Sequence, residues 1–295
     1  MTRSYERRGE WLMTRLPIDV DKEQEVSNVL RNMLGLTEKE AIRLQRTGGV
    51  QAGGGRLSVK LFPDEPAGFS SDWIPIDILY EDDFCLVASK PAGMPVHPTE
   101  PGQRGTLANA VAAYYESTGQ ACAVRHIHRL DADTTGPVLY AKNSYAQWRL
   151  DEAMREKAIG RVYLAVVQGV PKRTSGTINE PIGRDRHHPT RRRVSARGEH
   201  AVTHYETVSL FEQAALLRIR LETGRTHQIR VHMSHLGHPL LGDSLYGGQV
   251  SAGSIGRQAL HGESLSFHHP FTKEAIEVLC PLPEDYENVL QQLGS

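Results

Sequence analysis

The order of strands and helices beyond residue 72 limits the folds that this chain of 295 residues can adopt. Apolar residues that alternate or run continuously predict strands at 76–80, 85–88, 138–141, 162–167, 202–210 and 216–221. Helical apolar spacing follows Thr106, and it recurs after Ser144, which has capping-box spacing to Gln147. Helices that interrupt strands in this way predict an α+β fold with a mainly antiparallel mixed sheet and flanking helices.

A stretch rich in Pro, Gly and Ser at 63–71 is the best candidate for a domain boundary. Before it, we expect residues 1–25 to be irregular and residues 26–66 to form a small α/β module. After it, residues 67–295 are long enough for one large catalytic domain with a core of its own.

The small module is predicted from three local patterns. An apolar stripe from Val26 to Leu34 predicts one helix, Thr37 caps a second, and a glycine-rich turn at 49–55 joins two short strands. With its scattered Arg and Lys residues, this outline loosely resembles the small RNA-binding domain named after a small-subunit ribosomal protein. A plain helical cap on the large domain is the alternative.

Composition narrows the class of protein. The chain is 39% hydrophobic and 23% charged, and it has no apolar run near the roughly 20 residues that cross a bilayer. The N-terminus has no apolar core of a secretory signal, so we expect a cytoplasmic protein without a membrane partner. The cysteines Cys85, Cys122 and Cys280 lie far apart, which predicts neither disulfides nor a cysteine zinc site.

Residues 128–136 are typical of an active-site loop, because they combine charged and hydroxyl side chains and end on a glycine before an apolar run. Two carboxylates, Asp131 and Asp133, suggest a glycosidase pair. Such pairs flank the scissile bond, which separate elements achieve more easily than one loop. We therefore expect Asp133 to brace the loop through a hydrogen bond to its backbone or to Thr135.

An arginine-rich segment at 184–197 is the strongest local charge in a chain whose net charge is −1. The segment contains a single acid, Asp185, and six arginines, which are Arg184, Arg186, Arg191, Arg192, Arg193 and Arg197. Such a run forms either a solvated loop or a phosphate-binding surface, because guanidinium forks match phosphate oxygens.

A second polar cluster opens a helix after Leu221. We expect Thr226 to cap this helix and Gly237 to end it in a left-handed conformation, with Ile229 facing the core. Arg230 then projects from the first turn on another face, where a buried arginine requires a carboxylate partner.

Two other chemistries fit the sequence only in part. His227, His232, His235 and His238 invite a metal site, but only His232 and His235 lie one helical turn apart, and no H-E-x-x-H pattern is present. The His-Arg-x-Asp pattern at residues 128–131 also occurs in protein kinases, but the chain lacks their glycine-rich phosphate loop and Asp-Phe-Gly motif. We therefore expect neither a metal nor a cofactor.

Four motifs in order resemble the RluA class of pseudouridine synthases. They are His128-Arg129-Leu130-Asp131-x-x-Thr134-Thr135-Gly136, Tyr163-Leu164-Ala165-Val166-Val167-x-Gly169, Thr223-Gly224-Arg225-Thr226-His227-Gln228-Ile229-Arg230-Val231-His232 and Gly242-Asp243-x-x-Tyr246-Gly247. The resemblance covers roughly residues 73–285. It implies a pseudouridine synthase fold over 67–295 and an isomerase that converts uridine to pseudouridine in structured RNA.

The resemblance also implies roles for individual residues. Asp131 matches the catalytic aspartate of the class, Tyr163 its active-site tyrosine and Arg230 the basic partner of the aspartate. Contacts with the RNA are expected from His128, Arg129, Arg184, Arg191, Arg192, Arg193, Arg225, His227 and Gln228. For His128, a brace of the loop is the alternative.

The reaction and its substrate remain open in three respects. Asp131 could attack the sugar or the base, or remove a sugar proton. Large-subunit ribosomal RNA is the leading substrate and transfer RNA the alternative, and we expect a monomer. A ribosome-assembly factor without chemistry is the competing function, although a binding protein has no need of Asp131, Tyr163 and Arg230 together.

Overall fold

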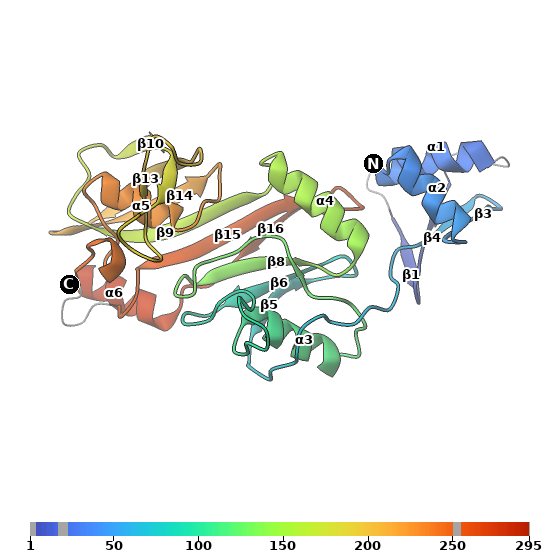
Figure 1. Cartoon of the computed structure of the whole chain (residues 1–295), viewed down its shortest axis with the longest axis horizontal. Coiled ribbons are helices and arrows are strands. Elements are labelled where there is room, and N and C mark those ends of the chain that lie inside the picture. The colour runs from blue at the N-terminus through green and yellow to red at the C-terminus, as the bar shows by residue number, and fades with distance from the viewer. Residues whose placement is uncertain (1–3, 17–22, 250–254, 295) are drawn as a thin grey trace.

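This computed structural model describes residues 4–16, 23–249 and 255–294, and its longer strands form three antiparallel sheets. Figure 1 shows a small sheet with two helices at one end of the molecule and two larger sheets side by side along the rest. The predicted α+β class, with antiparallel sheets and flanking helices, is confirmed.

The small N-terminal sheet has the strand order β1-β2-β4-β3. Its elements are β1 (Glu6–Arg8), β2 (Trp11–Arg15), α1 (Glu23–Leu34), α2 (Glu38–Arg46), β3 (Val50–Gly53) and β4 (Arg56–Lys60). The two helices, the turn and the Thr37 cap agree with the prediction, and Thr37 forms a full capping box with Glu40.

The expectation that residues 1–25 are irregular was wrong for residues 6–15. These residues form the hairpin β1-β2, which pairs with β4 so that Leu12 lies opposite Val59. Leu12 is the one fully buried side chain of this hairpin, so the sequence shows too few apolar residues for a period of two to be visible. Residues 1–3 and 17–22 of the same segment lie outside the described residues.

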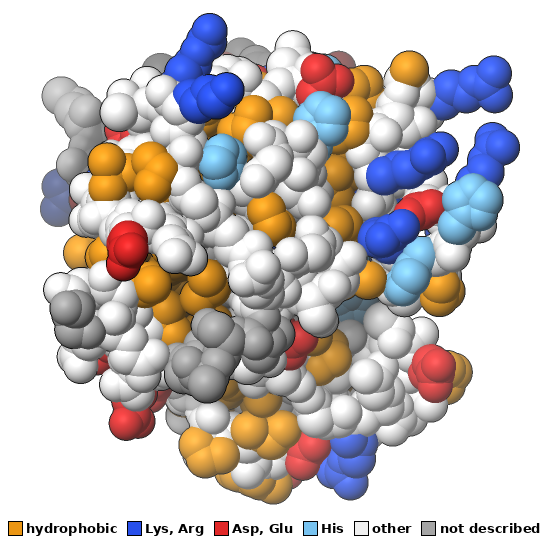
Figure 2. All heavy atoms as spheres, turned by 90° about the vertical axis from the view of Figure 1, so that its left-hand side faces the viewer, with side chains coloured by type: hydrophobic (Ala, Val, Ile, Leu, Met, Phe, Trp, Pro, Cys, Tyr) orange, Lys and Arg blue, Asp and Glu red, His pale blue; other side chains and the backbone are white. Residues whose placement is uncertain are grey.

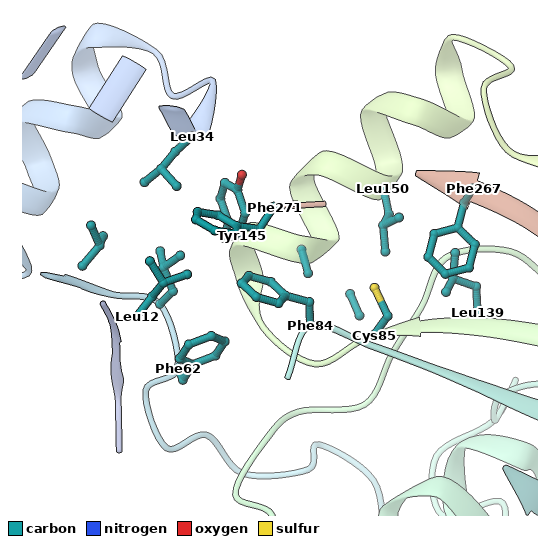
Figure 3. Close-up of a cluster of buried hydrophobic side chains, with 14 of the residues drawn as sticks. Leu12, Leu34, Phe62, Phe84, Cys85, Leu139, Tyr145, Leu150, Phe267 and Phe271 are labelled. Carbon is teal, nitrogen blue, oxygen red and sulfur yellow. The ribbon is translucent and has the colours of Figure 1, made fainter. Parts of the chain in front are cut away.

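Aromatic side chains join the N-terminal module to the large domain. The Phe84 ring centroid lies 5.2 Å from those of Tyr5 and Phe62 and stacks on Phe271 at 5.8 Å. Figure 3 shows Phe84 between the leucines of the module and the sheet of the large domain. The hydrophobic core therefore continues across the boundary that the sequence suggests at 63–71.

The four-stranded sheet of the large domain is covered on both faces. Its elements are β5 (Asp77–Glu81), β6 (Cys85–Lys90), β7 (Arg125–His126), β8 (Gly136–Ala141), α3 (Leu107–Ser117) and α4 (Ser144–Arg155). Alternate residues of β6 and β8 pack on α3 and on α4. Thr106 caps α3 as predicted, but the cap of α4 is Asn143 and not Ser144, because the Asn143 side chain accepts the Ala146 N–H.

The six-stranded sheet has the order β10-β13-β14-β9-β15-β16. Its elements are β9 (Gly160–Gln168), β10 (Ser175–Asn179), β13 (Val202–Leu210), β14 (Ala214–Leu221), β15 (Leu260–His268) and β16 (Ala275–Leu279). One face packs on α5 (Gln228–His235) and the other on α6 (Glu284–Gly294). A hairpin of β11 (Ile182–Arg184) and β12 (Arg192–Val194) and a 3-10 turn, η1 (Ser244–Tyr246), lie near α5.

The two large sheets meet where β8 begins beside β15. The Gly262 N–H donates to the Thr135 carbonyl at 2.7 Å, and a Cβ on Gly136 would lie 2.7 Å from the Gly262 Cα. Gly136 also has a φ of 137°, a conformation that favours glycine. The glycine that closes the 128–136 loop is therefore required by the crossing of two backbones, and this crossing positions the loop.

Candidate active site

Lys90 fixes one side of the 128–136 loop. Its side chain is fully buried, and its Nζ donates to the carbonyl oxygens of Pro91 at 2.7 Å, Met94 at 2.8 Å and Ala132 at 2.6 Å. Three acceptors satisfy the three donors of an ammonium group. Because Ala132 follows Asp131, this arrangement ties the backbone beside the carboxylate to the loop after β6.

Residues near the start of β15 fix the other side of the loop. Arg257 Nη1 donates to the Asp133 carbonyl at 3.0 Å, and the Thr135 hydroxyl lies 2.8 Å from His261 Nδ1. The expected brace from Asp133 to the loop backbone or to Thr135 was wrong, because the exposed Asp133 side chain makes no hydrogen bond among the described residues. The loop is braced from β15, a distant element whose proximity the local sequence does not reveal.

Arg230 lies between two carboxylates. Its Nη1 is 3.1 Å from Asp131 Oδ2, while its Nε and Nη2 bind both oxygens of Asp243 at 2.7 and 2.9 Å. The Arg230 and Asp243 side chains are 9% and 1% exposed, whereas Asp131 is 25% exposed. Burial alone would lower the pKa of Arg230, but the two carboxylates raise it, so the guanidinium stays charged. The prediction that Arg230 pairs with a carboxylate is confirmed, with Asp243 as a second partner.

His227 and Tyr246 complete the wall around this pair. The Tyr246 hydroxyl accepts the Arg192 N–H at 2.8 Å and lies 2.8 Å from His227 Nδ1, while the Arg230 guanidinium lies 5.0 Å from the Tyr246 ring centroid. Burial lowers the pKa of His227, although Asp131 opposes the shift. Neutral His227 therefore accepts a hydrogen bond from the Tyr246 hydroxyl on Nδ1, and its Nε2–H lies 3.9 Å from Asp131 Oδ2.

The start of α5 differs from the prediction. The residue before the helix is His227 rather than Thr226, its φ is 59°, and no side chain caps the helix. A left-handed conformation is uncommon outside glycine and costs of order 1 kcal/mol or more. It turns the His227 ring toward the carboxylate, which no capping pattern in the sequence would indicate. Gly237 ends the helix in a left-handed conformation, as predicted.

Tyr163 and Asp131 line the same cavity, which has a volume of about 300 Å³. Tyr163 is buried on β9, and burial raises the pKa of its hydroxyl, with Asp131 adding to the shift and Arg161 opposing it. The phenol is therefore protonated at neutral pH. Arg230 and Leu260 border the same space, so the sequence-predicted trio of Asp131, Tyr163 and Arg230 is brought together.

A second cavity, of about 640 Å³, borders the same ion pair. Asp131, Arg129 and Arg230 border both cavities, and Arg129 is exposed. His97 and Arg257 lie along the second cavity. The Asp131–Arg230 pair is thus shared by the two cavities of one polar cleft.

Two residues that were predicted to contact the substrate form hydrogen bonds within the protein. Gln228 is buried; its Oε1 accepts from the Thr223 hydroxyl and the Arg225 N–H, and its Nε2 donates to the Val202 carbonyl. Gln228 therefore braces the turn before α5. His128 is buried as well, and its Nε2 accepts the Leu139 N–H at 3.3 Å. This bond supports the loop, and a contact of either residue with RNA stays a prediction.

The predicted arginine contacts lie around the cleft at different distances from it. Arg225 borders the smaller cavity and pairs with Glu199, while Arg191 pairs with Asp185. Arg184 and Arg193 are exposed on the β11-β12 hairpin, and the backbone N–H of Arg192 bonds to Tyr246. Figure 2 shows Lys, Arg and His side chains gathered along one edge of this end of the molecule.

The histidines of the 227–238 segment bond to different groups. His232 contacts the Thr203 hydroxyl and the Glu180 carbonyl, and His238 contacts the Gln168 carbonyl. Among the residues that the structure describes, no three His, Cys, Asp or Glu side chains gather as a metal site requires. Within the same residues, no helix is long and apolar enough to cross a membrane.

Known proteins are similar to this chain in sequence and in fold. The profile of the family described as RNA pseudouridylate synthase matches residues 84–235. The "uncharacterized RNA pseudouridine synthase YhcT" of Bacillus subtilis is 47% identical over 238 residues, covering 80% of this chain and 78% of that protein. Ribosomal large subunit pseudouridine synthase D of Salmonella typhimurium is 41% identical over 256 residues, covering 82% of this chain and 77% of that protein. A solved structure, human RNA pseudouridylate synthase domain containing 4, matches with a TM-score of 0.61 and 26% identity, covering 74% of this chain and 92% of that one.

Proposed function

The chain belongs to the RNA pseudouridylate synthase family and is an isomerase that acts on RNA, and we propose that it converts uridine to pseudouridine in ribosomal RNA. The family predicted from the sequence motifs is thereby confirmed. The observation that carries the proposed chemistry is the Asp131 carboxylate, held 3.1 Å from Arg230 in the cavity that Tyr163 also borders.

Asp131 is the proposed catalytic carboxylate. Isomerisation breaks the bond from ribose C1′ to uracil N1, turns the base and joins C1′ to C5, which then loses its proton. An ionised carboxylate can serve this sequence by attacking the sugar or the base, or by removing a sugar proton. Arg230 favours the ionised form, because it places a positive charge next to the carboxylate. Asp243 keeps Arg230 in place, since it binds the guanidinium through two parallel hydrogen bonds.

Tyr163 is the proposed partner for the base. Its ring offers a surface on which uracil can stack, and its protonated hydroxyl can exchange a proton with the base or the sugar. The cavity is small enough that a uridine must leave its helix to enter, at a cost of a few kcal/mol. Arg129, exposed at the mouth of both cavities, is the proposed contact for the flipped nucleotide.

Large-subunit ribosomal RNA is the proposed substrate, with transfer RNA as the alternative. The relatives named ribosomal large subunit pseudouridine synthase D support this choice, as does the exposed arginine hairpin beside the cleft. The N-terminal module is proposed to bind RNA through basic residues of α2, such as Arg43 and Arg46, which are exposed. We further propose that the protein acts as a cytoplasmic monomer without a cofactor.

The decisive experiment follows the hydrogen at uracil C5. Cellular RNA that carries tritium at this position is incubated with the wild-type protein and with Asp131→Asn, which keeps the shape of the side chain. We expect tritium release from the wild type and a loss of about 10⁴-fold in the variant. No release from any RNA tested would refute the isomerase. Sequencing the modified positions then separates ribosomal from transfer RNA.

A further inference from the structure

Arg161 lines the catalytic cavity without an acidic partner. It lies on β9, two residues before Tyr163, so both side chains leave the strand on the same face about 7 Å apart. Among the described residues, the Arg161 side chain forms no ion pair, and its Nε is buried without a hydrogen-bond partner. Arg161 is half-buried, and a buried donor that lacks an acceptor is costly unless a ligand supplies one.

Gly224 leaves the space that the Arg161 guanidinium occupies. A Cβ at this position would lie 2.8 Å from Arg161 Nη1. Gly224 belongs to the turn before α5 and borders the same cavity. The guanidinium therefore extends from β9 to this turn and forms part of the cavity wall.

His128 brings a second unpaired donor to the same cavity. Burial, together with the Arg161 cation, lowers the pKa of His128 to about 3, so its ring is neutral. Since Nε2 accepts the Leu139 N–H, the proton of the neutral ring lies on Nδ1. Nδ1 is buried and has no partner, although the residue borders the cavity. Arg161 and His128, which both border the cavity, thus each have a buried N–H group that lacks an acceptor.

We propose that Arg161 and His128 form a phosphate subsite that binds a phosphodiester next to the flipped uridine. The inference rests on the proposed function and names a contact for that substrate. Phosphodiesters are the anionic groups of RNA, and a guanidinium fork matches two of their oxygens. With its base stacked on Tyr163, a nucleotide can place its own phosphate at Arg161, because the two side chains leave neighbouring positions of one strand face.

The subsite can be tested by binding a fluorescein-labelled oligouridylate to the full chain. The variants are Arg161→Met, Arg161→Lys and, as a matched control, Arg155→Met, because Arg155 is exposed at the end of α4 and borders neither cavity. We expect Arg161→Met to weaken binding about 10- to 100-fold at low salt and to lower the salt slope by about 0.7. The affinity of Arg161→Lys should lie between those of the wild type and Arg161→Met, and the affinity of Arg155→Met should match that of the wild type.

A neutral oligomer identifies the group that is bound. An oligouridylate with methylphosphonate linkages lacks the phosphate charge, so the difference between the wild type and Arg161→Met should disappear. The inference is overturned if Arg161→Met matches Arg155→Met, if its deficit persists on the neutral oligomer, or if the wild type does not bind oligouridylate. These outcomes are independent of tritium release, so failure of the subsite and failure of the isomerase are distinguishable.

Discussion

Two arginines of the cleft, Arg230 and Arg161, have opposite electrostatic surroundings. Arg230 lies between Asp131 and Asp243, which together satisfy three of its nitrogen atoms. Arg161 borders the same cavity, yet its Nε has no partner among the described residues. Arg230 therefore has its acidic partners before RNA binds, whereas the proposed subsite supplies a counter-charge to Arg161 only when the substrate binds.

Replacing each arginine by methionine separates these situations most strongly. Arg230→Met leaves two carboxylates without their cation, so we expect the free energy of unfolding to fall by about 3–5 kcal/mol. Isomerisation should fall about 10³-fold or more. Arg161→Met leaves no carboxylate without a partner, so it should change the free energy of unfolding by less than about 0.5 kcal/mol. Urea unfolding followed by circular dichroism measures the stability of both variants. Equal losses of stability would contradict the difference between the two arginines.

Asp243→Asn tests whether the second carboxylate matters. Asp243 is 1% exposed and binds Arg230 through two hydrogen bonds, so neutralising it should cost about 1.5–3 kcal/mol of stability. We expect a loss of activity of about 10- to 100-fold, because the variant loses the charge and one of the two acceptors that position Arg230.

Glu263→Gln is the matched control for that substitution. It weakens a pair that Glu263 forms with Arg218, also through two hydrogen bonds, but the two side chains are 26% and 36% exposed and border neither cavity, so the change should cost at most about 1 kcal/mol. If the two variants lose the same stability and activity, burial of Asp243 has no special role.

His128 predicts a pH effect at the end of the cleft that carries Arg161. Its pKa of about 3 lies below the ordinary value of 6.5. Between pH 3 and pH 6.5, His128 is therefore protonated in the unfolded chain and neutral in the folded chain. Stability is therefore lost as pH falls below about 6.5. Between pH 7 and pH 5 this residue should account for about 2 kcal/mol. Urea unfolding of His128→Gln should show a smaller dependence on pH, and identical slopes would contradict the neutral ring.

The parts of the site that the sequence predicts are those with strong local patterns. Asp131, Tyr163 and Arg230 belong to motifs, and the need of a buried arginine for a carboxylate follows from its charge alone. The identity of that carboxylate does not follow from the local sequence. Asp131 is 99 residues from Arg230 in the chain and Asp243 is 13, so the pairing depends on how two sheets meet.

The same reasoning accounts for what the sequence missed. Lys90 stands in a proline-rich loop, and nothing local shows that its ammonium group reaches the Ala132 carbonyl. Arg161 resembles any charged residue at the start of a strand until the cavity beside it is known. The strands, most helices and the α+β class follow from the periodic spacing of apolar residues. The hairpin at 6–15 does not, because it buries so few apolar side chains.

The aromatic cluster around Phe84 has a consequence for substrate choice. Because Tyr5 and Phe62 of the N-terminal module pack directly on Phe84 and Phe271, the module is not free to swing on a flexible tether. Its outer surface and the cleft stay at a constant separation. With the module bound to RNA as proposed, we expect a target to present its uridine and a second feature at one fixed spacing.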